Sequence, residues 1–506
     1  MKHIHYIYTL FFGVSALLFF GLAYPHHLHY QEQYQLFLFD SSYIWDVIAL
    51  PGGVADLLGR FSTQFFLYAW VGATIIAILL SVIQLLTLGL ANWGRFYGLS
   101  YVPAFLLWIF LLDENALLGG VWAVVLTLSA SLAIDKMADG WTRRILTAML
   151  IPLLFWIAGP VSIVFCILQI RRANHFIWNI ATMLLFVLMP LVLAHCLPVL
   201  DGSLWRGIHY HRYPTVIPTM LWMAVLALVI LLGVQGVKGV KGVKDECTCR
   251  YKSHTPNDIL LTFASFAVVA VVMAVMVWKN SNFKAEKTMK YDFMACHQQW
   301  NRILNTIDEE KPNNQIGVTV QNLALAKQGT LLNKMFEYNQ NGMLGLLPDV
   351  QRDATSPMPT AEAYYHLGLT NIAQRTVFEA QEAILDFQKS ARCFKRLAQT
   401  NLINGDYEVA RKYLMILKKT LFYSDWANET ITLLGNEKAI ANHPEYGTLR
   451  TFAIKNDFLF SDNATPEILE RLYLSNKKNK LAYQYMMASF ILTGDRESFY
   501  KYAQNK

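Results

Sequence analysis

Long uncharged runs in the first half of the chain restrict its fold more than any other feature. Between Tyr6 and Trp278 the sequence repeatedly presents runs of mostly apolar residues. An α-helix needs about 20 such residues to cross a hydrocarbon core of about 30 Å. Only 16% of the 506 residues are charged, against about 25% in ordinary soluble proteins. We therefore expect an all-α protein with a transmembrane domain at 1–278 and a soluble domain at 279–506.

The apolar runs predict about nine membrane crossings. Seven runs read as single spans: Tyr6–Tyr24, Phe65–Leu90, Leu99–Leu112, Leu117–Ile134, His175–Leu197, Pro214–Val234 and Ile259–Trp278. The longer run Ile145–Ile170 has Gly159-Pro160 at its centre, where proline must kink or break a helix. We count it as a hairpin of two short helices; one kinked span is the alternative. The first span also resembles a signal peptide, but we expect an uncleaved anchor because many spans follow.

The charges of the loops predict an orientation. Lysine and arginine are enriched in cytoplasmic loops. With a cytoplasmic N-terminus, the basic segments all fall inside: Arg95, Lys136–Arg144, Arg171-Arg172 and the loop 235–258 with its Gly-Val-Lys triplets. The acidic segment Glu32–Asp56 then falls outside. We therefore expect a multi-pass protein of the bacterial inner membrane, with residues 25–64 and the domain 279–506 in the periplasm.

The exported loop 25–64 carries aromatic and acidic residues together. Its aromatic side chains from Tyr34 to Trp45 suit a helix that lies in the membrane interface. Pro51-Gly52-Gly53 then turns the chain, and Val54–Phe61 forms a second such helix. On this interpretation three charged side chains face the lipid headgroups: Asp46, Asp56 and Arg60.

The second half reads as helix almost throughout. Apolar residues recur at spacings of three and four, and Asn404-Gly405-Asp406 separates two amphipathic helices. Related turns are expected at Gly368 and at Gly494-Asp495. The pattern resembles tetratricopeptide repeats, which stack into a solenoid whose concave face binds peptides or proteins. The alternative is a compact helical domain that packs on its own transmembrane bundle.

Two segments carry a resemblance to a known family. HLHYQEQYQLFLF at 27–39 and ALPGGVADLLGRFSTQFF at Ala49–Phe66 are similar to an uncharacterised family of multi-pass inner-membrane proteins from Bacteroidota. The resemblance implies an inner-membrane protein, with membrane spans and a helical domain. It implies no activity, and no catalytic residue is carried over from it.

Catalytic motifs of soluble enzymes are absent from the sequence, but the outer loops hold candidate site residues. The layout resembles polytopic glycosyltransferases that use lipid-linked substrates. In such an enzyme one of the acids Glu32, Asp40 or Asp46 would act as a general base or a metal ligand. The second outer loop would bind a lipid phosphate or pyrophosphate through Arg206, His209, His211 and Arg212. The acidic pair that such enzymes carry soon after the first span is missing. We therefore rank this transferase second, after an assembly or interaction module of the cell envelope.

Histidine and cysteine spacings do not predict a metal site. His26, His27 and His29 lack a standard ligand spacing, and Cys247-x-Cys249 with His254 is one ligand short of a structural zinc site. The net charge of +7 reflects orientation, so nucleic acid is not an expected partner. The expected partners are the lipid bilayer and an envelope protein or peptide, or a lipid-linked substrate for a transferase. The sequence leaves open whether the chain is an enzyme, and it indicates no cofactor.

Overall fold

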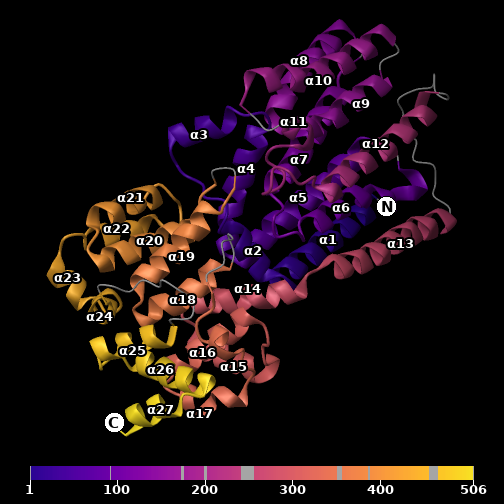
Figure 1. The fold of residues 1–506 in the computed structure, drawn as a ribbon. Coiled ribbons are helices and arrows are strands. Elements are labelled where there is room, and N and C mark those ends of the chain that lie inside the picture. Colours follow the sequence, from indigo (N-terminus) through magenta and orange to yellow (C-terminus); the bar gives the residue numbers. More distant parts are fainter. Residues whose placement is uncertain are drawn as a thin grey trace. The chain divides into compact units, whose positions relative to one another are not determined.

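The computed structural model describes most of the chain, namely residues 2–91, 93–138, 140–172, 176–198, 202–240, 256–349, 356–385, 388–454 and 465–504. Within these ranges the protein is helical and has no β-strand (Figure 1), which confirms the all-α class. The chain divides into two compact units. Unit 1 is Met1–Glu32 with Asp40–Asn282, and unit 2 is Gln33–Phe39 with Phe283–Lys506. We refer to Gln33–Phe39 as the strap.

Unit 1 contains the apolar runs. Its α-helices are α1 (Lys2–Leu18), α2 (Pro25–Glu32), α3 (Ser41–Ile48), α4 (Gly53–Thr63), α5 (Ala69–Gly89), α6 (Val102–Phe110), α7 (Leu118–Asp135), α8 (Trp141–Ala158), α9 (Ile163–Arg172), α10 (Phe176–Cys196), α11 (Ser203–Arg206), α12 (Thr219–Val240) and α13 (Pro256–Asn280). Shorter helical turns are η1 (Phe19–Ala23), η2 (Gln64–Leu67), η3 (Gly94–Tyr101) and η4 (Gly159–Ser162). Residues 241–255, with most of the predicted basic loop and the Cys247, Cys249 and His254 set, lie outside the described residues.

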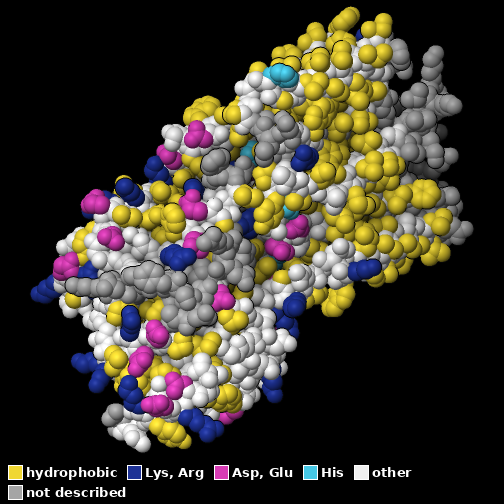
Figure 2. All heavy atoms as spheres, in the orientation of Figure 1, with side chains coloured by type: hydrophobic (Ala, Val, Ile, Leu, Met, Phe, Trp, Pro, Cys, Tyr) yellow, Lys and Arg dark blue, Asp and Glu magenta, His cyan; other side chains and the backbone are white. Residues whose placement is uncertain are grey.

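Six helices of the described chain are long and apolar enough to cross a membrane: His5–Ala23, Ala69–Gly89, Leu118–Asp135, Trp141–Ile170, Ile177–Cys196 and Phe263–Asn280. Phe96–Phe110 and Thr219–Gly233 are apolar but shorter. Figure 2 shows hydrophobic side chains over much of the visible face of unit 1, whereas charged side chains gather on unit 2. The surface helices of a water-soluble protein turn polar residues outward. Unit 1 departs from that pattern.

The run Ile145–Ile170 is broken at its glycine and proline. Helix α8 ends at Ala158, and Gly159 adopts a φ of +70° that favours glycine. After η4, α9 runs back along the unit, because Arg143 in the first turn of α8 donates a hydrogen bond to Gln169 in α9 at 3.1 Å. Helices α8 and α9 therefore form the two arms of a hairpin.

The turn at Pro51-Gly52-Gly53 packs onto this hairpin. Gly52 has a φ of +83°, and its N–H donates to the carbonyl of Trp156 at 2.7 Å. Helix α4 then crosses α7 at close range. A Cβ at Gly59 would lie 2.4 Å from the backbone nitrogen of Gly119, so both positions need glycine. The second predicted helix of the 25–64 loop thus corresponds to α4, but it packs inside unit 1.

The predicted interfacial helix over Tyr34–Trp45 is only partly correct. Residues Ser41–Ile48 are helical, but Gln35–Asp40 have no helical structure, and the strap belongs to unit 2. Two backbone hydrogen bonds hold it there, from Leu36 to the carbonyl of Lys389 at 3.1 Å and from Phe39 to that of Lys419 at 2.8 Å. Leu36 also enters a buried apolar cluster of unit 2. Tertiary contacts therefore replace the helix that amphipathic composition predicts.

Unit 2 is a series of short helices. They are α14 (Phe283–Cys296), α15 (Trp300–Glu310), α16 (Gln315–Lys327), α17 (Leu331–Lys334), α18 (Pro357–Leu367), α19 (Thr370–Glu382), α20 (Ala391–Asn404), α21 (Tyr407–Leu417), α22 (Ser424–Ile431), α23 (Glu437–Asn442), α24 (Tyr446–Phe452), α25 (Thr465–Ser475), α26 (Lys480–Thr493) and α27 (Arg496–Ala503), with the turns η5 (Met335–Glu337) and η6 (Gly342–Gly345).

Helical hairpins occur at the three predicted turns. Gly368, Gly405 and Gly494 have φ values of +96°, +92° and +74° and end α18, α20 and α26. Glycine at this position closes a helix without steric cost. In the middle hairpin, Ala410 and Leu414 of α21 are fully buried. Each fully buried leucine contributes about 1.5 to 3 kcal/mol, so the apolar faces that define the hairpins also hold them together.

Candidate functional site

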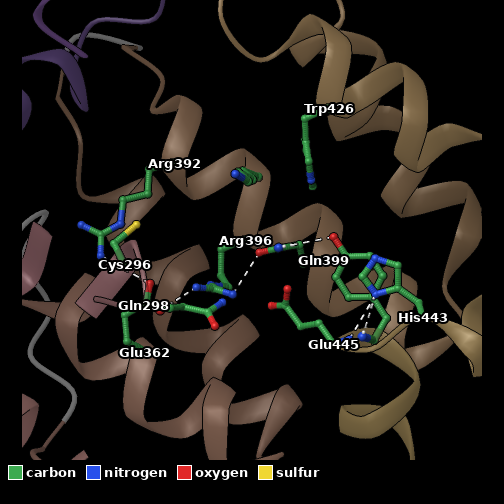
Figure 3. Close-up of a pocket in the computed structure, with 11 residues that line it drawn as sticks. Cys296, Gln298, Glu362, Arg392, Arg396, Gln399, Trp426, His443 and Glu445 are labelled. Atoms are coloured by element: carbon green, nitrogen blue, oxygen red, sulfur yellow. Dashed lines mark hydrogen bonds and ion pairs between the residues drawn. The ribbon is translucent and has the colours of Figure 1, made fainter. Parts of the chain in front are cut away.

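A polar cavity of about 240 Å³ lies within unit 2 (Figure 3). Five segments contribute to its wall: the end of α14, helices α18, α20 and α22, and the start of α24. The lining residues are Cys296, Gln298, Glu362, Arg392, Lys395, Arg396, Gln399, Trp426, His443, Glu445 and Tyr446. The volume is slightly below the usual range of drug-sized pockets, so the cavity suits a small group.

Helix α20 supplies the three cations of the cavity. It begins after Ser390, whose hydroxyl accepts a hydrogen bond from the N–H of Cys393. Such a cap satisfies an amide that the helix leaves without a partner. Arg392, Lys395 and Arg396 follow at spacings of three and four, which place them on one face of a helix. The opposite face carries the apolar residues of the core.

Arg392 is fixed by acids from two other helices. Its two terminal nitrogens bind the carboxylate oxygens of Asp292 at 2.5 and 2.8 Å, and one lies 3.4 Å from Glu362. It also donates to the side-chain oxygen of Gln33 in the strap at 3.2 Å. The Arg392 side chain is only 7% exposed. A bidentate pair of this kind orients the guanidinium as well as neutralising it.

Arg396 is held between a carboxylate and an aromatic ring. Its guanidinium donates to Glu362 at 2.6 Å and lies 3.6 Å from the ring centre of Tyr365. Burial alone would raise the pKa of Glu362, but Arg396 and Arg392 outweigh it and lower that pKa to about 2. Glu362 is therefore ionised at neutral pH. Arg392, Glu362 and Arg396 form a buried chain of alternating charge.

The opposite wall combines aromatic rings with one carboxylate. The Lys395 ammonium lies 5.1 Å from the ring centre of Trp426, and His443 stacks on Tyr446 with centroids 4.0 Å apart. Glu445 accepts a hydrogen bond from the Tyr365 hydroxyl at 2.8 Å. Figure 3 shows Trp426 of α22 and Glu445, just before α24, pointing toward the cavity. This wall can therefore contact both an apolar and a polar part of a ligand.

A second polar cluster lies in unit 1, where two loops predicted to be exported meet. Asp56 of α4 is fully buried and pairs with Arg60 at 2.7 Å, and His209 lies 3.4 Å from the same carboxylate oxygen. The prediction that Asp56 and Arg60 face lipid headgroups is therefore wrong. The two are four residues apart on a helix that is packed against α7, so their charges compensate each other inside the unit.

Comparison with known proteins places the chain in a family. The model of a family of unknown function, DUF6057, matches residues 2–506. The chain belongs to this family. Neither the curated proteins nor the solved structures contain a match. The functional argument for this member of DUF6057 therefore depends on its own residues.

The predicted acids of this DUF6057 protein lie on or beside the short helices α2 and α3. Glu32 ends α2, Asp40 precedes α3 and accepts a hydrogen bond from Ser42, and Asp46 is exposed on α3. Asp56, predicted from the sequence to face the headgroups, and Asp113 are acids that meet the loop at 206–212, through His209 and His211.

The predicted phosphate-binding residues form polar contacts within unit 1. Arg206 donates to the carbonyl of Thr215 at 3.2 Å, and His211 binds Asp113 at 3.2 Å. Arg212 lies 3.5 Å from the side-chain oxygen of Asn115. Burial would raise the pKa of Asp113, but the hydrogen bond from His211 lowers it below its ordinary value. These residues hold the loop against neighbouring segments of unit 1, with His209 placed on Asp56.

Sequence reasoning missed the cavity in unit 2 completely. One signal was present, because three cations recur at helical spacing in α20, a helix with an otherwise apolar pattern. A single basic stripe is usually a solvated face. The acids in and beside the cavity come from three other segments of the chain: Asp292, Glu362 and Glu445. Only the fold brings them together.

Proposed function

We propose that the chain is a multi-pass inner-membrane protein whose unit 2 lies in the periplasm and acts as a binding module in envelope assembly. The main support for this proposal is the place of the strap in unit 2. Residues Gln33–Phe39 and Phe283–Lys506 form one compact unit. Both segments must then lie on the same side of any membrane that unit 1 crosses, so the number of crossings between them is even.

The apolar segments of unit 1 satisfy this condition. The hairpin of α8 and α9 returns to the side from which it starts, as the Arg143–Gln169 hydrogen bond indicates. Six further apolar segments lie between the strap and unit 2: Ala69–Gly89, Phe96–Phe110, Leu118–Asp135, Ile177–Cys196, Thr219–Gly233 and Phe263–Asn280. The hairpin contributes two crossings, the six segments contribute six, and the first span contributes one. These segments therefore support the nine-crossing topology. A single kinked span in place of the hairpin would separate the strap from unit 2.

The charges of the loops support the periplasmic side. Basic segments precede α8 and follow α9 and α12, whereas Asp113 and Glu114 lie between α6 and α7. Positive loops stay in the cytoplasm, so the strap and unit 2 fall outside. The helical hairpins of unit 2 support a tetratricopeptide-like solenoid, and the charged cavity is a candidate binding site within it. We therefore assign binding to this cavity.

Reporter fusions test the topology. A fusion after Lys252 should report the cytoplasm and a fusion after Lys290 the periplasm. The reverse pattern would overturn the proposal.

The binding role is tested in a strain that lacks the gene, by measuring envelope sensitivity to detergent. Wild type and the exposed control Lys412→Gln should restore resistance, whereas Lys395→Gln should not. Equal rescue by all three would exclude a role for the cavity.

A lipid-dependent glycosyltransferase remains the second candidate. The observation that favours it is the meeting of α4 with the loop at 206–212 through Asp56 and His209. An acid and a histidine that are close together on the outer face are a reasonable pair for general acid–base chemistry. Against it, Asp56 is fully buried and already paired with Arg60. Access for a substrate would require this pair to separate.

A further inference from the structure

We infer that the cavity of unit 2 binds a ligand with a single carboxylate, which sits on Lys395 and the Nε–H of Arg392, while Glu445 accepts a hydrogen bond from the same ligand. The inference deepens the proposed function and rests on it. The ligand class is a carboxylate on a body of one or two amino-acid residues. Both a free organic acid and the C-terminus of a peptide present this chemistry.

Two cationic donors in the wall lack acceptors. The Nε of Arg392 is buried and has no hydrogen-bond partner in the described structure, although both terminal nitrogens of this guanidinium are bound. Lys395 forms no ion pair within the described ranges, and its ammonium lies 5.1 Å from the ring centre of Trp426. A buried donor without an acceptor costs about 1 to 3 kcal/mol. An oxyanion bound here would supply the ammonium with a counter-ion and, where it reaches the Nε–H, an acceptor for the guanidinium.

The charge balance around the cavity sets the charge of the ligand. Four basic side chains lie in or beside it, Lys327, Arg392, Lys395 and Arg396, against three acidic ones, Asp292, Glu362 and Glu445. The basic groups exceed the acidic ones by one. One carboxylate compensates this excess, whereas a doubly charged phosphate would leave a negative charge in a partly buried place. Burial lowers the pKa of Lys395, as expected for an ammonium that lacks a counter-ion.

The other lining residues indicate which groups the ligand carries besides its carboxylate. Trp426 and Tyr446 offer apolar surface, and Glu445 offers a carboxylate that is hydrogen-bonded only by the Tyr365 hydroxyl among the side chains described. An amide N–H beside the ligand's carboxylate fits this acceptor. The volume of about 240 Å³ leaves room for one or two residues and not for a folded segment. A carboxylate next to an amide is the chemistry of a peptide C-terminus and of N-acylated amino acids.

Cys296 provides a direct readout, because its thiol lines the cavity and is half-buried. The experiment uses the full-length protein in nanodiscs, with mass-spectrometric measurement of N-ethylmaleimide labelling. The exposed Cys196 of unit 1 is the internal control. The probes are N-acetylphenylalanine, its uncharged amide, the peptide acetyl-Gly-Gly-Phe with free or amidated C-terminus, and inorganic phosphate, each at millimolar concentration. Titration calorimetry with the same probes gives a second measurement.

The free carboxylates should slow labelling of Cys296 and leave Cys196 unchanged. Protection by N-acetylphenylalanine alone would indicate a free acid, and protection by the peptide as well would indicate a C-terminus. Lys395→Gln should weaken binding about tenfold or more, because a charge-assisted hydrogen bond is lost, whereas Lys412→Gln should not. Binding of the amides or of phosphate as tight as that of the carboxylates would overturn the inference. So would the absence of heat and protection with every carboxylate.

Different results would reject the periplasmic binding module and the proposed ligand class. Cytoplasmic reporter activity after Lys290 would reject the periplasmic module, even if Cys296 were protected. Periplasmic activity and failed rescue by Lys395→Gln, with no carboxylate binding, would retain the module and reject the ligand class.

Discussion

Gln33 and Arg392 are 359 positions apart in the sequence, and the side-chain oxygen of Gln33 accepts a hydrogen bond from the Arg392 guanidinium at 3.2 Å. The same guanidinium binds Asp292 and lines the cavity of unit 2. One side chain therefore connects the strap to the cavity wall.

Replacing Arg392 with methionine should strongly destabilise unit 2. The change leaves the carboxylates of Asp292 and Glu362 without their shared partner in a buried place. Breaking a buried ion pair costs about 3 to 5 kcal/mol. Hydrogen exchange of α14 and α20 in the full-length protein measures the loss. The control is Arg375→Met, because Arg375 pairs with Glu379 at the surface and such pairs contribute about 0 to 1 kcal/mol. Equal effects of the two changes would contradict this assignment.

Truncating Leu36 should release the strap. Leu36 is 7% exposed and packs in a cluster with Met358, Leu397 and Leu414. Leucine-to-alanine changes in a core cost about 2 to 5 kcal/mol. We expect Leu36→Ala to accelerate exchange at the Leu36 and Phe39 amides and to admit proteases between α2 and α3. Phe39→Ala is the matched control, since that ring is 52% exposed. Retained protection in Leu36→Ala would show that the backbone hydrogen bonds suffice.

The helices and turns of this protein could largely be predicted, because their signals are local. Glycines such as Gly405 and Gly494 mark helix ends through a backbone conformation that other residues avoid. Gly159-Pro160 marks the break between α8 and α9 for a similar reason. The apolar runs indicate where helices lie, since their periodicity depends only on neighbouring residues.

The strap and the cavity could not be predicted, because they depend on pairings of residues that lie 34 to 359 positions apart in the sequence. The sequence of Tyr34–Phe39 is amphipathic and suits an interfacial helix, but hydrogen bonds to Lys389 and Lys419 place it elsewhere. Asp56 likewise looks like a surface acid. Its burial follows from the close approach of α4 to α7, which the two glycines at 59 and 119 permit.

Acid should destabilise unit 2 through Glu362. Its pKa is lowered to about 2 in the folded protein, whereas an unfolded glutamate titrates near 4.3. The unfolded chain therefore binds the proton first, so the stabilising contribution is complete above about pH 4.3 and is lost as pH falls toward 2. The midpoint of thermal unfolding should fall over this interval. Glu362→Gln should remove that part of the pH dependence, and an unchanged profile would show that other carboxylates dominate.

The transferase alternative makes its own prediction about the predicted acids. On the binding-module proposal, Glu32→Gln and Asp40→Asn should restore envelope resistance as well as wild type at equal protein level. Neither acid is part of the cavity in unit 2. Failure of either variant, with normal folding, would favour outer-face catalysis. Detergent sensitivity of the complemented strain is the measurement, with an immunoblot as the control for expression.

Asp56→Asn should act on folding rather than on chemistry. The Asp56 carboxylate is fully buried, with Arg60 at 2.7 Å and His209 at 3.4 Å. Its neutralisation leaves the arginine charge uncompensated in the interior, at a cost of about 3 to 5 kcal/mol. We expect a lower unfolding temperature in nanodiscs and faster exchange in α4, whereas Asp46→Asn, at an exposed position on α3, should change neither. If Asp56→Asn folded with wild-type stability but failed to restore envelope resistance, Asp56 would have a chemical role and the glycosyltransferase would become the stronger candidate.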